Sequence, residues 1–122
     1  MARNRRVYQI GERIKELVAE HLIHSADPRF TLVTITSVMV SPDLGLAKVY
    51  WVVSFTSNMD REQRISEVEE AFEAGQGHLR HIISKQLGIR FVPHLRFYYD
   101  DTLDTVEQVE RLMNRIKGPE TP

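Results

Sequence analysis

Four histidines and two closely spaced glycines stand out in this 122-residue chain for the chemistry that their spacing could support. His21 and His24 are three residues apart, as are His78 and His81, a spacing that places both rings of each pair on one face of a helix. Such a pair could contribute two ligands to a metal ion. Because the sequence indicates no third ligand for either pair, we expect solvated helix-surface histidines and no metal site.

A base and an acid, His94 and Asp100, lie in one stretch with the alternation of a strand. Six residues in a strand span about 20 Å at ~3.3 Å per residue, which is too far for a direct proton relay. Asp100 is followed by Asp101 and Thr102, a sequence typical of turns and helix caps. The chain has no cysteine, so cysteine nucleophiles and thiolate metal sites are excluded. We therefore expect neither an enzyme nor a cofactor.

The two glycines, Gly75 and Gly77, lie between two stretches with helical spacing. A Gly-x-Gly segment lets a backbone approach phosphate closely when the N-terminus of a basic helix follows. In the second stretch His78, His81 and Lys85 share one face, opposite the apolar residues. The alternative is that the glycines allow two helices to pack tightly. The sequence leaves both interpretations open.

Charge is unevenly distributed along the chain, although 16 basic and 17 acidic residues give a net charge of -1. Residues 1–15 carry five basic residues and one acid, and residues 76–99 carry four basic residues and no acid. Residues 60–73 and 100–110 are mainly acidic. If the basic stretches fold onto one side, a cationic face would attract a polyanion despite the small total charge. The alternative is that both are ordinary solvated surfaces.

The spacing of apolar residues predicts the helices and strands that would position these groups. We expect helices over residues 7–22, 65–72, 79–87 and 103–116, and strands over residues 31–40, 46–55 and 91–99. Residues 41–45 predict a hairpin turn in which Gly45 takes a positive φ. A two-helix connection between strands predicts an α+β domain whose helices cover one face of a three-stranded sheet.

Length and composition predict one soluble domain, since 42% of the residues are hydrophobic and 27% are charged. The longest apolar run, residues 49–53, is far shorter than the ~20 residues that span a membrane. The basic first residues are not followed by the apolar stretch of a signal peptide. We expect a cytoplasmic monomer with a single domain over residues 1–117 and a flexible tail over residues 118–122.

Several segments together carry a resemblance to a known family. In residues 87–101, Arg90 stands three residues before Pro93, and the pattern Leu-x-Phe-x-x-Asp follows; residues 27–29, 38–44, 47–50 and 77–80 match in the same order. The chain resembles ribosome-binding factor A, a bacterial assembly factor of the small ribosomal subunit. The resemblance implies a type II KH-like domain of order α-β-β-α-α-β, here with an added C-terminal helix.

KH modules clamp nucleotides with a Gly-x-x-Gly loop between two helices. In this family the loop resembles a shortened Ala-x-Gly kink, which falls on residues 75–77 of this chain. Here Gly75 replaces the alanine, a departure that predicts a looser kink and an angle between the helices that is not fixed.

The resemblance implies a non-catalytic factor that binds the free 30S subunit and promotes late maturation and 5′-end processing of 16S rRNA. Its implied partners are precursor 16S rRNA and a ribosome-assembly GTPase. The residues expected to contact RNA are Arg3, Arg5, Arg6, Arg13, Arg29, Lys48, Gly75, Gly77, His78, Arg80, His81, Lys85, Arg90 and Arg96. Arg29 has two alternative roles, an ion pair with Asp27 or the capping of a helix end.

The alternative function is a KH-like protein–protein interaction module without RNA binding. In that case the acidic run from Asp60 to Glu73, rather than the basic stretches, would carry the function.

Overall fold

The structure, a computed structural model, describes residues 2–56, 58–102 and 113. In chain order it contains helix α1 (Ala2–His24), the short 3-10 helix η1 (Pro28–Phe30), strands β1 (Val33–Val40) and β2 (Leu46–Val53), helix α2 (Arg61–Leu87) and strand β3 (His94–Tyr99). The helix expected over residues 103–116, apart from residue 113, and the tail expected over residues 118–122 lie outside the described residues.

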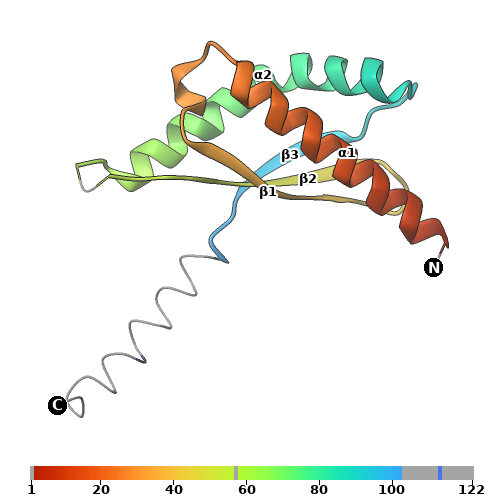
Figure 1. Cartoon of the computed structure of the whole chain (residues 1–122), viewed down its shortest axis with the longest axis horizontal. Helices are drawn as coiled ribbons and strands as arrows, with labels where there is room; N and C mark the ends of the chain where they lie inside the picture. Colours follow the sequence, from red (N-terminus) through yellow and green to blue (C-terminus); the bar gives the residue numbers. More distant parts are fainter. Residues whose placement is uncertain (1, 57, 103–112, 114–122) are drawn as a thin grey trace.

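The three strands form one sheet in the order β1-β2-β3. Strand β1 is antiparallel to β2, and β2 is parallel to β3. Figure 1 shows α1 and α2 on the same side of this sheet, which confirms the expected α+β architecture with helices on one face. The buried strand residues Ile35, Val49, Trp51 and Leu95 belong to the core between sheet and helices.

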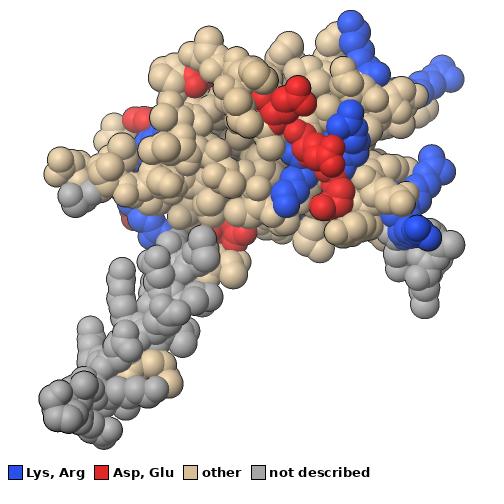
Figure 2. All heavy atoms as spheres, viewed as in Figure 1, with Lys and Arg blue, Asp and Glu red and all other residues tan. Residues whose placement is uncertain are grey.

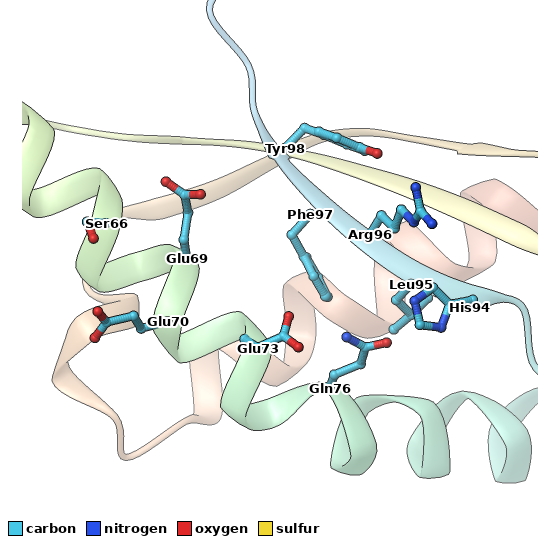
Figure 3. A pocket seen from close by; sticks show the side chains of 10 residues that line it. All are labelled: Ser66, Glu69, Glu70, Glu73, Gln76, His94, Leu95, Arg96, Phe97 and Tyr98. Carbon is cyan, nitrogen blue, oxygen red and sulfur yellow. The ribbon is translucent and has the colours of Figure 1, made fainter.

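The two helices expected on either side of Gly75 and Gly77 are the two halves of α2, which is assigned as one helix. Figure 1 shows the halves running in different directions, and Figure 3 places the bend near Gln76. At the start of α2 the Asp60 carboxylate accepts a hydrogen bond from the Gln63 N–H at 3.2 Å. At its end Gly88 has a φ of 61°, the left-handed conformation that favours glycine directly after a helix.

The hairpin turn between β1 and β2 forms, but with a different residue in the left-handed conformation. The Asp43 carboxylate accepts a hydrogen bond from the Gly45 N–H at 2.9 Å, as expected for a turn aspartate. The expectation of a positive φ at Gly45 is wrong, because Leu44 takes it instead, with φ 61°. The Leu44 N–H donates to the Ser41 carbonyl at 2.9 Å, which fixes the chain reversal one residue before the glycine.

Phe72 of α2 is completely buried and joins three other elements in the core. Its ring stacks on Phe97 of β3, with ring centroids 4.4 Å apart and an interplanar angle of 11°. It also lies 5.0 Å from the ring of Phe30 in η1 and 5.6 Å from that of Trp51 in β2. Offset and tilted ring pairs at these distances add to the free energy gained by burial alone.

Helix α1 approaches β1 closely at Gly11. A Cβ atom at this position would lie 3.1 Å from the Val38 carbonyl oxygen and 3.4 Å from a methyl carbon of Val40. At Gly75 and Gly77 a Cβ would have no neighbour within 4 Å. Of these three glycines, therefore, only Gly11 is required by the packing of a helix against its neighbours.

The first prediction compares Gly11→Ala with the matched variant Gly77→Ala. Gly11→Ala is expected to lower the free energy of unfolding by about 1 kcal/mol, because overpacking costs ~1–3 kcal/mol and the gain in helix propensity is about 1 kcal/mol. Gly77→Ala is expected to raise it by about 1 kcal/mol, since the methyl group meets open space. Urea unfolding measures both, and equal stabilisation by the two alanines would contradict the close approach of α1.

Helices α1 and α2 meet at His21 and His78, whose ring centroids are 5.3 Å apart. Partial burial, together with the charge of His78, lowers the pKa of His21 from its ordinary value of 6.5. The folded protein therefore holds this proton less tightly than the unfolded chain does. Folding stability is lost as the pH falls below about 6.5, because the unfolded state then binds more protons.

The second prediction concerns acidification from pH 7.5 to 5.5. The Tm of the wild type is expected to fall further than that of His21→Gln, which lacks the proton linkage, when thermal unfolding is followed by circular dichroism. The control is His24→Gln, because His24 is exposed on the same helix. The same fall of Tm in the wild type and in His21→Gln would show that the two histidines do not carry this linkage.

Candidate nucleic-acid interface

Exposed basic side chains gather at the end of the molecule where α1 begins and α2 ends. Arg5 and Arg6 are exposed near the start of α1, Lys85 is exposed near the end of α2, and Arg90 is exposed in the loop before β3. Figure 2 shows Lys and Arg projecting at this end, while acidic side chains, with further Lys or Arg beside them, run across the middle of the same view. These four residues are called the basic end below.

Phe91 adds an aromatic surface to the basic end. The Arg90 guanidinium carbon lies 5.5 Å from the centroid of the Phe91 ring, and 80% of Phe91 is exposed. Exposed aromatic rings and guanidinium planes are the groups on which unstacked RNA bases stack. Phe91 was not singled out from the sequence as an RNA contact, because it counts among the alternating residues of the strand predicted over residues 91–99, although Pro93 favours an edge position or a position outside the sheet for the first half of that strand. The strand begins only at His94, so Phe91 lies in the preceding loop.

The remaining residues of α1 that could contact RNA differ in how accessible their side chains are. The Arg13 guanidinium is exposed and forms an ion pair with Glu16 at 3.0 Å. Arg3 lies within α1, and its side chain is outside the described part of the structure. Tyr8, near the same end of α1, is 67% exposed and was not singled out from the sequence. Its position outside the apolar stripe of the helix is the signal that could have identified it.

Arg80 and Arg29 are expected RNA contacts that also bind other parts of the chain. The Arg80 guanidinium donates to the Val92 carbonyl at 3.1 Å and so ties the loop before β3 to α2. The Arg29 guanidinium donates to both carboxylate oxygens of Asp27, with the shortest distance 2.7 Å. This is the ion pair that the sequence left open as an alternative, and hydrogen bonds from Arg29 lower the pKa of Asp27.

Lys48 and Arg96 lie on the sheet face that the helices do not cover. They are register partners on β2 and β3, and both are exposed. Tyr50 and Tyr98, the register pair two residues further along the same face, have ring centroids 5.6 Å apart. These two cations therefore form a second basic area, on a different surface from the helix termini that carry the basic end.

The segment around Gly75 and Gly77 does not contain a helix N-terminus, because α2 continues through it. The backbone amides that would cradle a phosphate at a helix start are therefore within a helix. Tight packing of two helices is not the reason for the glycines either, since no atom would meet an added Cβ within 4 Å. His78 and His81 are exposed on the second half of α2, and His78 faces His21 of α1.

Asp100 has a structural role at the end of the sheet. One carboxylate oxygen accepts a hydrogen bond from the Thr36 hydroxyl at 2.7 Å, and the other accepts one from the Thr102 N–H at 3.0 Å. Hydrogen bonds from Thr102 and Thr36 lower its pKa, so Asp100 is held as a carboxylate that links the end of β3 to β1.

Among the described residues, no group of three or more histidine and carboxylate side chains is arranged to hold a metal ion. No helix in this part of the chain has the length and apolar character needed to cross a bilayer.

Comparison with known proteins identifies the family and the fold of this chain. A sequence model of ribosome-binding factor A matches residues 6–113. Ribosome-binding factor A of Dichelobacter nodosus is 34% identical over 112 residues, which cover 91% of this chain and 88% of that protein. The crystal structure of ribosome-binding factor A from Thermus thermophilus has a TM-score of 0.65 at 20% identity, covering 76% of this chain and 93% of that one.

A homology model of the Thermus thermophilus factor was fitted into a cryo-EM map of its complex with the 30S subunit. It has a TM-score of 0.58 at 21% identity and covers 74% of this chain and 90% of that one. With the family match extending over residues 6–113, this chain belongs to the ribosome-binding factor A family.

Proposed function

We propose that this chain binds the free 30S ribosomal subunit as an assembly factor and places its basic end on rRNA phosphates. The observation that carries the proposal is the gathering of Arg5, Arg6, Lys85 and Arg90 at one end of a protein whose net charge is -1. Family membership and the 30S complex of the Thermus thermophilus relative support the choice of the small subunit.

The physical basis is electrostatic attraction with stacking. Each exposed cation that neutralises a phosphate releases condensed counterions, which gives affinity that falls as salt rises. Contacts of this kind fix the orientation of the protein but read little sequence. The exposed ring of Phe91 beside Arg90 offers a stacking surface for an unpaired base. We infer that the shape of the rRNA, rather than its sequence, supplies most of the specificity.

The proposed action on 16S rRNA requires no bond to be made or broken by the protein. A factor that binds one arrangement of the RNA more tightly than another shifts the population toward the first. In this way the chain would promote late maturation and 5′-end processing of 16S rRNA in the cytoplasm as a non-catalytic monomer. A ribosome-assembly GTPase is the proposed partner for its release.

The third prediction uses co-sedimentation of the full chain with purified 30S subunits, 50S subunits and 70S ribosomes across a salt series. Binding is expected only to free 30S subunits. Lys85→Gln with Arg90→Gln is expected to reduce the slope of log affinity against log salt by about 2, because each lost phosphate contact reduces it by about 1. Arg5→Gln with Arg6→Gln is expected to act in the same way.

The control variant removes a positive charge at the start of α2. Arg90→Gln and Arg61→Gln remove the same charge, but Arg61 is in the first turn of α2 and lies 5.5 Å from the centroid of the Tyr99 ring. Arg61→Gln is expected to leave the salt slope unchanged. Equal slopes for Arg90→Gln and Arg61→Gln would refute the basic end as the contact surface. Absence of 30S binding at low salt would refute the proposed function and favour the protein-interaction module.

A further inference from the structure

A groove of about 590 Å³ runs between the first half of α2 and strand β3. One wall is formed by Ser66, Glu69, Glu70, Glu73 and Gln76 of α2, and the other by residues 94–98 of β3. Figure 3 shows Glu73, Gln76 and Phe97 beside this space, with the helix and the strand running past it in opposite chain directions. The groove lies far along α2 from Lys85 and shares no residue with the basic end.

Strand β3 is an edge of the sheet, and its free side faces this groove. The His94 N–H donates to the Gly45 carbonyl at 2.9 Å, and the Asp100 N–H donates to the Trp51 carbonyl at 2.7 Å. Because backbone groups alternate along a strand, those of Leu95 and Phe97 point away from β2. Within the described residues β3 pairs only with β2. A free edge of this kind can pair with an additional strand.

The helix wall of the groove is negatively charged. Glu69, Glu70 and Glu73 are all exposed, and none of them forms an ion pair within 4 Å among the residues that the structure describes. Arg96 and His94 lie on the strand wall, nearer to Gln76 than to Ser66 (Figure 3). Three carboxylates along one wall repel a phosphate backbone and attract lysine or arginine side chains.

We propose that this groove binds an extended lysine- and arginine-rich polypeptide segment. The segment pairs with the free backbone groups of Leu95 and Phe97 as a fourth strand, and its basic side chains contact the glutamates of α2. The spacing fits, because Glu69 and Glu73 are one helical turn apart, about 6 Å, and alternate residues of a strand are ~6.7 Å apart. The proposal does not depend on the RNA-binding function, since it uses a separate surface.

The fourth prediction is tested by NMR titration of the full, isotopically labelled chain with a capped peptide of alternating lysine and valine. The largest amide shifts are expected at Leu95 and Phe97. Glu69→Gln with Glu73→Gln is expected to weaken binding about twofold to thirtyfold, because each of the two exposed ion pairs contributes ~0.2–1 kcal/mol. The matched control, Glu12→Gln with Glu20→Gln, removes the same charge from α1 and is expected to have no effect.

A second peptide, methylated on the backbone nitrogens that would face β3, separates strand pairing from charge attraction. It keeps every lysine but has lost those donors, so it is expected to bind more weakly than the parent peptide. Equal binding of the two peptides, absence of binding, or equal weakening by the α1 control would overturn the proposal. A single-stranded oligouridine that shifted the Leu95 and Phe97 amides would assign the groove to RNA instead and would also overturn it.

Discussion

The buried ring of Phe72 is the contact on which the arrangement of the molecule depends. It stacks on Phe97 and lies against Trp51 and Phe30, so a single side chain connects α2 with β3, β2 and η1. Loss of a buried phenylalanine ring costs about 3–5 kcal/mol, a large part of the ~5–15 kcal/mol that keeps a domain folded. The positions of the groove and of the basic end both depend on the Phe72 ring, because this ring fixes where α2 crosses the sheet.

The Phe72 ring determines where the groove lies, and the bend in α2 determines where the basic end lies. Stacking of Phe72 on Phe97 holds the first half of α2 above β3, where its glutamates line a space along the strand edge. After the bend near Gln76, the second half packs through Leu79 and Ile83 and leads to Lys85 at the other end. Arg80 then ties the following loop to the helix through the Val92 carbonyl, which holds the base of the loop that carries Arg90 and Phe91.

Features set by neighbouring residues were predictable, and features set by distant contacts were not. The Asp60 cap, the Gly88 stop and the hairpin follow from local hydrogen bonds and backbone preferences, which the sequence displays directly. The sequence did not predict that α2 continues through Gly75 and Gly77. Each glycine costs a helix about 1 kcal/mol, and only the packing of the flanking apolar residues offsets this cost. For the same reason Arg80 could be read only as a surface charge, since its carbonyl partner belongs to another element.

The separation of charge explains how a protein with a net charge of -1 can present two surfaces of opposite sign. Glu69 and Lys85 are sixteen residues apart on α2, which is about 24 Å along a straight helix and somewhat less along a bent one. Screening in physiological salt reduces interactions between exposed charges beyond ~8 Å. The glutamates of the groove therefore do not cancel the field at the basic end. A polyanion approaching the molecule is attracted at one end and repelled at the groove, so charge alone orients the encounter before any specific contact forms.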